Sequence, residues 1–271
     1  MVIMGEETEH HHEHGQMPQG VHPSFMRVIQ QKQRVKQKLS NIKHKIGVYS
    51  AKGGVGKTTI AINLAYALKE KGFKVGLLDA DIDCPNVTMF LGMENEKMEP
   101  VMPLKPIEKN GVKVASTAML VDEMKRPIIW RGPIIVKMLG DFFENTEWGA
   151  LDYLIIDLNP GTSDSPLTIM QVLDLDGFVI VTTPQRIAGI NAIRSGMMAK
   201  RLGVSVLGVV ENMSDGKPSK STKDIVEALG TKLLGVVKSE PRIAAMSDAG
   251  KIHVIEDKAI RAEFDSIIKE L

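Results

Sequence analysis

The feature that most constrains the fold is a glycine-rich segment at residues 51–59, with the sequence AKGGVGKTT. It follows an apolar run rich in β-branched residues at 46–49 and opens a helix-length stretch at 57–70. A chain that turns through glycines from a strand into a helix presents backbone N–H groups to one point, where they can surround phosphate oxygens. The segment therefore predicts a phosphate-binding loop.

The side chains of this loop suit a nucleoside triphosphate with magnesium. Lys57 can reach the β- and γ-phosphates, and the hydroxyl of Thr58 can ligate Mg²⁺. The general pattern G-x-x-x-x-G-K-[ST] is not met to the letter, because Ala51 stands at its first glycine. The residues expected to surround the phosphates are Gly53, Gly54, Val55, Gly56, Lys57, Thr58 and Thr59.

The rest of the chain alternates between strand-like apolar runs and helix-length segments. The runs lie at 46–49, 74–78, 112–116, 153–156, 178–181, 206–210 and 233–237, and the helical segments at 57–70, 134–144, 191–202 and 223–229. Because parallel strands need crossover connections, this order predicts an α/β fold with a doubly wound, mostly parallel sheet and helices on both faces. Ligands of such sheets bind at the carboxyl ends of the strands.

Residues 1–25 differ from the remainder of the chain. They are polar, contain five of the seven histidines and show no apolar period, so we expect a disordered, His-rich arm. Residues 26–271 are expected to form a single domain that begins with a basic amphipathic helix extending to about residue 43. The histidines and glutamates of the arm are candidate ligands for Zn²⁺, Ni²⁺ or Cu²⁺, and a polar tail without a function is the alternative.

Composition narrows the class of protein. The single cysteine, Cys84, excludes an internal disulfide framework and any metal site that needs two thiolates from one chain. We interpret it as a small, partly buried residue. The chain has no run of 18 uncharged apolar residues and no signal peptide pattern, so we expect a cytoplasmic protein without a membrane span.

The near-neutral net charge of +1 hides an uneven distribution. Residues 15–69 hold ten Lys and Arg and no Asp or Glu, whereas residues 1–14 hold four Glu and no Lys or Arg. A basic stretch can bind nucleic acid or anionic lipid, or it can flank a site for a phosphorylated ligand. The phosphate loop within the stretch favours the last of these.

Two further strand ends carry carboxylates. The second predicted strand ends in Asp79 and Asp81, and the run at 153–156 is followed by Asp157. Adjacent parallel strands would bring these groups beside the phosphate loop, where an Asp can orient an attacking water or hold Mg²⁺ through its hydration shell. We therefore predict a metal site formed by Thr58, Asp79 and Asp157.

Taken in order, the motifs of the chain resemble those of the Mrp/ApbC-type ATPases. These are iron–sulfur cluster carriers within the deviant Walker A group of P-loop proteins that includes MinD and ParA. The likeness extends over about residues 42–260 and rests on KGGVGKTT, DADIDCPN, WRGP, DLNPGTSD, TTPQ and ENMS.

This resemblance implies an ATP hydrolase that converts ATP to ADP and phosphate as a homodimer or as a heterodimer with a paralogue. Its partner would be a client apo-protein, with no clear role for nucleic acid or membrane. Lys52 matches the signature lysine that reaches the phosphates held by the partner subunit. Such a crossing lysine couples ATP binding to dimerisation.

The resemblance also assigns roles inside one subunit. Asp81 matches the carboxylate that positions the hydrolytic water, and Asp157 matches the Walker B aspartate. Asn212 matches the amide that reads the adenine edge, and Pro241 and Arg242 match a segment that covers the base. With Lys52 and Lys57, these two aspartates form the expected catalytic set.

The chain departs from the family where a cluster would bind. Members of the family usually follow the N-M-S turn with a C-x-x-C pair for a bridging [4Fe–4S] cluster, but residues 212–220 read NMSDGKPSK. Two chains with one cysteine each cannot replace two such pairs. The sequence thus predicts a slowly hydrolysing dimeric ATPase related to the carriers, with a MinD/ParA-like positioning ATPase, or a metallochaperone or maturation ATPase that uses the His-rich arm, as alternatives.

Overall fold

A computed structural model describes residues 23–82, 84–120, 132–161, 166, 169–170 and 172–271. Residues 1–22 of the expected arm at 1–25 lie outside the described residues, as do Asp83 and the Trp130 and Arg131 of the WRGP motif, whereas residues 23–25 are helical. The division into an arm and one domain remains a prediction. No helix among the described residues has the length and apolar character needed to cross a bilayer.

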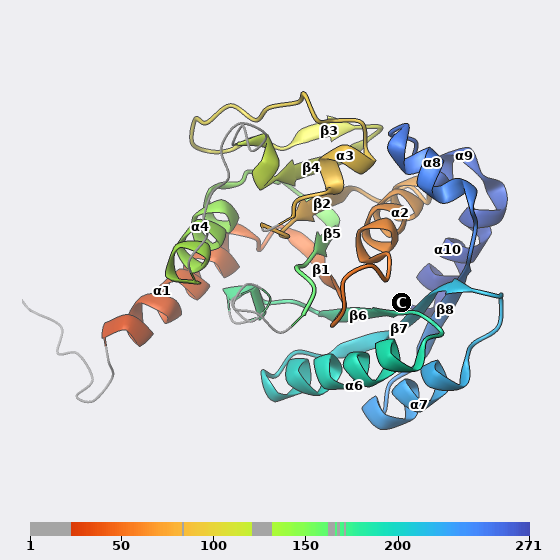
Figure 1. Cartoon of the computed structure of the whole chain (residues 1–271). Helices are drawn as coiled ribbons and strands as arrows, with labels where there is room; N and C mark the ends of the chain where they lie inside the picture. Colours follow the sequence, from red (N-terminus) through yellow and green to blue (C-terminus); the bar gives the residue numbers. More distant parts are fainter. Residues whose placement is uncertain (1–22, 83, 121–131, 162–165, 167–168, 171) are drawn as a thin grey trace, which may run out of the picture.

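An eight-stranded sheet forms the centre of the molecule (Figure 1). Its strands are β1 (Ile42–Tyr49), β2 (Val75–Asp79), β3 (Ile107–Lys109), β4 (Val112–Ser116), β5 (Leu151–Asp157), β6 (Gly177–Thr182), β7 (Val206–Ser214) and β8 (Leu233–Lys238). They lie in the order β3-β4-β2-β5-β1-β6-β7-β8, and all neighbours are parallel except β3 and β4. The predicted, mostly parallel sheet is confirmed.

Helices cover both faces of this sheet (Figure 1). They are α1 (Pro23–Lys38), α2 (Lys57–Glu70), α3 (Val87–Phe90), α4 (Gly132–Asn145), α6 (Arg186–Arg201), α7 (Lys220–Leu229), α8 (Arg242–Asp248), α9 (His253–Glu256) and α10 (Lys258–Glu270). Helices α2 and α10 pack on one face, and α6 and α7 pack on the other. Strands β2 and β6 are buried along their whole length, with α2 packed against β2 and α6 packed against β6.

Some helices begin or end elsewhere than their sequence periods predict. Helix α1 ends at Lys38, because the buried Ile42 already begins β1 beside β5. Helix α7 begins three residues earlier than expected, since the side chain of Ser219 accepts the N–H of Thr222 and caps the helix. The interpretation of Cys84 as partly buried is wrong, because its side chain is exposed.

The strand order brings the predicted functional segments to one edge of the sheet. Strand β1 lies between β5 and β6, and β2 lies on the other side of β5. The register places Asp79 directly beside Asp157 and Val48 on the other side of Asp157. The carboxyl ends of β1, β2 and β5 therefore meet where β1 turns into α2.

Candidate functional site

The phosphate loop connects β1 to α2 in a conformation that depends on glycine. Gly54 and Gly56 have φ angles of 78° and 80°, a region that side chains rarely adopt. Gly56 is the N-cap residue of α2 and makes no side-chain cap, so the first N–H groups of the helix are available to an anion. A Cβ added at Gly53 or Gly54 would meet no atom within 4 Å. The loop thus has an open cradle in front of a helix N-terminus.

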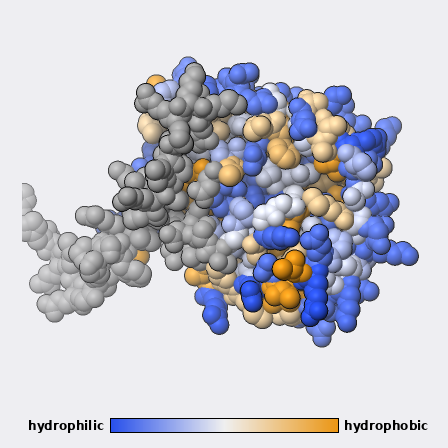
Figure 2. Space-filling view, viewed as in Figure 1, coloured by the Kyte–Doolittle hydropathy of each residue, from blue (hydrophilic) through white to orange (hydrophobic). Residues whose placement is uncertain are grey.

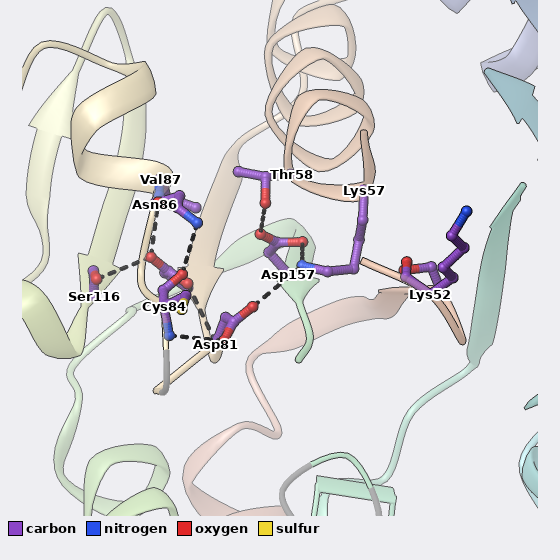
Figure 3. A network of polar contacts seen from close by, with 11 residues as sticks. Lys52, Lys57, Thr58, Asp81, Cys84, Asn86, Val87, Ser116 and Asp157 are labelled. Atoms are coloured by element: carbon purple, nitrogen blue, oxygen red, sulfur yellow. Dashed lines mark hydrogen bonds and ion pairs between the residues drawn. The ribbon is translucent and has the colours of Figure 1, made fainter. Parts of the chain in front are cut away.

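Lys57 is held inside the protein by carboxylates (Figure 3). Its Nζ donates to Oδ1 of Asp157 at 2.5 Å and lies 3.9 Å from Oδ2 of Asp81. The hydroxyl of Thr58 donates to the other oxygen of Asp157 at 2.7 Å. These four side chains come from α2, β5 and the loop after β2, and the structure brings them together as the sequence predicts.

Asp79 lies in the same cluster, but its hydrogen bonds point elsewhere. Its carboxylate accepts from the N–H groups of Asp81 and Val87 and from the hydroxyl of Ser116, all at 3.1–3.2 Å. Burial raises the pKa of Asp79 well above its usual range, and the charge of Asp157 raises it further, while Lys57 opposes both. Three carboxylates around one lysine form an acidic cluster that a divalent cation would neutralise.

Lys52 has a different environment from Lys57. Its side chain is exposed, and its Nζ makes a long contact of 3.4 Å with Oε1 of Gln185 at the start of α6. Figure 3 shows it directed away from the aspartates. Its charge is therefore available at the surface of the loop.

Asn212 packs directly against the phosphate loop. Its Nδ2 donates to the carbonyl oxygen of Val55 at 2.9 Å, and a Cβ at Gly56 would lie 2.2 Å from the same nitrogen. The next residue, Met213, has a φ of 55°, which turns the chain sharply after the asparagine. The hydrogen bond to Val55 and the turn at Met213 thus hold Asn212 at the edge of the loop.

The turn after Asn212 is fixed by a buried carboxylate. Glu211 accepts hydrogen bonds from the hydroxyls of Ser214, Ser219 and Thr222 and from the N–H of Ser219. Burial raises the pKa of Glu211, but these hydrogen bonds outweigh it and lower the pKa below its usual range. The charged carboxylate also complements the N-terminus of α7.

Pro241 and Arg242 begin α8, and both are exposed. Arg242 pairs with Glu240 and Asp257, and the bond with Arg242 lowers the pKa of Glu240 to about 2. No contact described in the structure joins these residues to the phosphate loop.

A buried polar network that the sequence did not predict joins α2, α8 and α9. Asn63 of α2 donates from Nδ2 to Nδ1 of His253 at 2.8 Å and accepts the N–H of Val254 at 3.0 Å. Nε2 of the same imidazole lies 3.1 Å from the hydroxyl of Ser247 on α8. Burial lowers the pKa of His253, which favours the neutral form of the ring. In the sequence, the signal for this network was the single polar residue Asn63 within an apolar stretch of the predicted helix.

The donor set fits nucleotide and magnesium. Phosphate requires N–H groups and a cation, which the α2 N-terminus and Lys57 provide. Magnesium takes oxygen ligands, and a hydroxyl and a carboxylate already lie 2.7 Å apart in Thr58 and Asp157. Among the described residues no group of three or more His, Cys, Asp and Glu side chains is arranged to hold a metal ion, so magnesium bound at Thr58 and Asp157 would take its other ligands from water and phosphate oxygens.

Known proteins resemble this chain over most of its length. A ParA-type family model described as the NUBPL iron-transfer P-loop NTPase matches residues 41–271. An iron-sulfur cluster carrier protein of Methanocaldococcus jannaschii is 40% identical over 262 residues, which cover 90% of this chain and 89% of that protein. The carrier protein of Aquifex aeolicus is 40% identical over 257 residues, covering 89% and 71%.

Solved structures also resemble this chain over most of its length. A nucleotide-binding protein from Archaeoglobus fulgidus, solved in complex with ADP, has a TM-score of 0.70 and 32% identity, and the match covers 82% of this chain and 92% of that one. The cell division ATPase MinD of Pyrococcus furiosus has a TM-score of 0.62 at 23% identity, covering 84% and 97%, which shows a likeness of fold alone.

Proposed function

Because the chain belongs to the family of NUBPL iron-transfer P-loop NTPases, we propose that it binds and slowly hydrolyses ATP as a dimer and acts in iron–sulfur cluster assembly. The observation that carries the proposal is the group formed by the buried Lys57 and Asp157 with the half-buried Thr58, behind an open glycine cradle. This group combines a phosphate-binding cation with oxygen ligands for magnesium.

Nucleotide binding would replace one partner of Lys57 by another. The ammonium group, now bound to Asp157, would donate to phosphate oxygens, while the N–H groups at the start of α2 would bind the same phosphates. Thr58 and Asp157 would hold Mg²⁺, which when bound neutralises charge on the β- and γ-phosphates. The buried carboxylates outnumber the lysine in this cluster, so they repel one another. A bound Mg²⁺ would reduce this repulsion and so favour the transfer of Lys57 from Asp157 to the phosphates.

Asp81 is the proposed residue that orients the hydrolytic water. Its carboxylate is buried and lies 3.9 Å from Nζ of Lys57, the cation expected to bind the phosphates. Asp79 is less suited to this role because burial favours its protonated form, which cannot accept a proton. We assign Asp79 instead to supporting the metal side of the cluster.

The remaining assignments concern the partner subunit and the base. The exposed Lys52 would reach the phosphates of a second copy or of a paralogue, which makes ATP binding depend on dimerisation. Asn212 would donate to the adenine from its position against Val55, and Pro241 and Arg242 would cover the base. These roles rest on the family resemblance together with the location of Asn212.

The cysteine content of the chain limits how it could handle an iron–sulfur cluster. The relatives are named iron-sulfur cluster carrier proteins, whereas this sequence has one cysteine, which lies exposed beside the aspartate cluster. A [4Fe–4S] cluster needs several thiolates. We therefore propose that any cluster handled by this protein takes cysteine ligands from a partner or client protein.

Two measurements test the proposal. Asp81→Asn should bind ATP and dimerise but hydrolyse ATP at least about tenfold more slowly, with Asp215→Asn, an exposed aspartate, as the matched control. An unchanged turnover number would remove Asp81 from the mechanism. Anaerobic reconstitution with iron and sulfide should leave the isolated protein without a stoichiometric [4Fe–4S] absorbance, and a stable cluster would contradict the partner-ligand proposal.

The positioning alternative receives less support. It relies on the basic character of α1, but Arg34 and Lys36 of that helix pair with Glu144 and Asp174 of the body. Part of the positive charge of the helix therefore lies beside carboxylates of the same chain. The metallochaperone alternative rests on the histidine arm and remains a prediction.

A further inference from the structure

Helix α6 carries an apolar surface that the proposed nucleotide chemistry does not use. Ile187, Ile190 and Met197 are 61%, 44% and 49% exposed. Figure 2 shows an apolar patch flanked by hydrophilic side chains over this helix, in the lower part of the view. Large side chains in such a group usually mark a contact surface.

A groove runs along the same side of α6. It encloses about 700 Å³ between α6 and the start of α7, and Arg186, Ile190 and Ile193 line one wall. Lys220 and Asp224 lie on the other wall. Gly189 of α6 also lines the groove. Helix α7 approaches it so closely that a Cβ at residue 189 would lie 2.0 Å from the hydroxyl oxygen of Ser221.

The charge of this surface is one-sided. Helix α6 has four basic residues and no acidic residue, and Arg186, Arg194 and Arg201 are exposed on it. Asp224 is the one carboxylate among the residues described as lining the groove. An occupant that matches this surface must combine apolar side chains with negative charge.

The first residues of the chain have that composition. Residues 1–4 are MVIM, and residues 1–22 contain four glutamates and no Lys or Arg. We propose that this N-terminal segment docks into the α6 groove of its own chain, with the apolar residues 1–4 against Ile190 and Ile193 and the glutamates near Arg186 and Arg194.

The length of the segment permits this contact. Eighteen residues lie between residue 4 and Pro23, and an extended chain spans about 3.3–3.6 Å per residue, or roughly 60 Å in total. A domain of this size has a radius of gyration of roughly 18 Å. Attachment to the same chain also gives the segment an effective concentration in roughly the millimolar range.

Other surfaces match the segment less well. Helix α1 is basic, but no large apolar side chain is exposed in the part of the helix whose side chains the structure describes, from Ile29 onward. The exposed Val101 and Met102 follow Glu96 and Glu99 in the chain, so a glutamate-rich segment would be repelled there. The α6 groove combines exposed apolar groups with cations that outnumber the carboxylates among the residues described as lining it or exposed on α6.

Photo-crosslinking of the full chain tests the proposal. A benzophenone side chain in place of Ile3 should attach to residues 186–201 or 219–224, and a mixture of ¹⁵N-labelled and unlabelled protein should show the attachment within one chain. Attachment to α1 or to another element would overturn the proposal. Attachment only between copies would also overturn it and would assign the groove to a second copy.

Charge reversal tests the recognition itself. Arg186→Glu with Arg194→Glu should lower the crosslinking yield about fivefold or more, because each exposed ion pair contributes a factor of roughly 1.5 to 5. Adding Glu6→Arg and Glu7→Arg should restore the yield. The matched control is Lys258→Glu with Lys269→Glu, which reverses two exposed cations on α10 and should leave the yield unchanged. Equal losses in both reversal pairs, or a failure of the restoring variant, would refute docking by charge and shape.

Discussion

Replacing Lys57 by methionine should destabilise the nucleotide-free protein as well as abolish ATP binding. Lys57 is 7% exposed, and its Nζ lies 2.5 Å from Asp157. At an effective dielectric constant of about 20, that separation corresponds to an attraction of roughly 7 kcal/mol before the cost of desolvation. Removing one partner of a buried pair costs about 3–5 kcal/mol, because the other charge is left buried and unpaired.

The expected change is large enough to measure by thermal denaturation. A loss of 3–5 kcal/mol corresponds to a fall of roughly 6–20 °C in the melting temperature of a domain of this size. The measurement uses apyrase-treated protein at pH 8, where the carboxylates have the strongest tendency to ionise. Lys52→Met is the matched control, since Lys52 is an exposed lysine of the same loop and its loss should change stability by less than about 0.5 kcal/mol.

A second variant separates charge from general damage. Lys57→Met combined with Asp157→Asn removes the unpaired carboxylate, so most of the lost stability should return while ATP binding, measured by calorimetry, should not. If Lys57→Met melts within about 2 °C of the parent, or if the double variant is as unstable as the single one, the buried ion pair does not stabilise the empty site and the argument is refuted.

Three further predictions follow from the same region. Burial raises the pKa of Asp79, so the protonated carboxyl stabilises the fold at acidic pH and this stabilisation is lost as the pH rises through the raised pKa. Asp79→Asn should therefore have a higher melting temperature than the parent at pH 8. The difference between the two melting temperatures should narrow toward pH 4. Gly56→Ala should cost about 1–2 kcal/mol or more in urea unfolding, since φ is 80° and a Cβ would meet an amide at 2.2 Å, whereas Gly53→Ala should cost less than about 0.5 kcal/mol. Asn63→Ala leaves His253 and a neighbouring N–H without their partner and should cost about 1–3 kcal/mol in the same assay.

Each of these has a clear opposite outcome. A melting temperature of Asp79→Asn that runs parallel to the parent at every pH would mean that Asp79 is charged in the fold. Equal stability of Gly56→Ala and Gly53→Ala would mean that the positive φ at Gly56 does not require glycine. A loss below about 0.5 kcal/mol for Asn63→Ala would mean that water replaces its hydrogen bonds.

Much of the fold could be predicted because the hydrophobic pattern is strong. Helix α2 begins and ends where its period predicts, at Lys57 and Glu70. The antiparallel strand β3 was missed, although Asn110 and Gly111 adopt φ angles of 46° and 81° in the turn before β4, as an Asn-Gly pair commonly does. Three residues are too few for a period to show, so the turn was the better signal.

The candidate site divides in the same way. The loop glycines, Lys57 and Thr58 follow each other in the chain, so their chemistry could be inferred from spacing. The union of Lys57 with Asp157 could not be seen in this way, since 100 residues separate them and only the pairing of β5 with β1 brings them together. Neither the lowered pKa of His253 nor the α6 groove leaves a pattern in the sequence, because both depend on which helices pack together.

The sequence by itself determined the alternation of strands and helices, the glycine-dependent loop and the uneven charge of the chain, because these depend on neighbouring residues and on local period. The tertiary structure decided that three aspartates share one lysine and that Asp79 has a raised pKa. It also decided that Asn212 lies against the loop and that α6 exposes apolar side chains beside cations. These properties depend on burial and on distances between remote segments, which are fixed only when the sheet assembles.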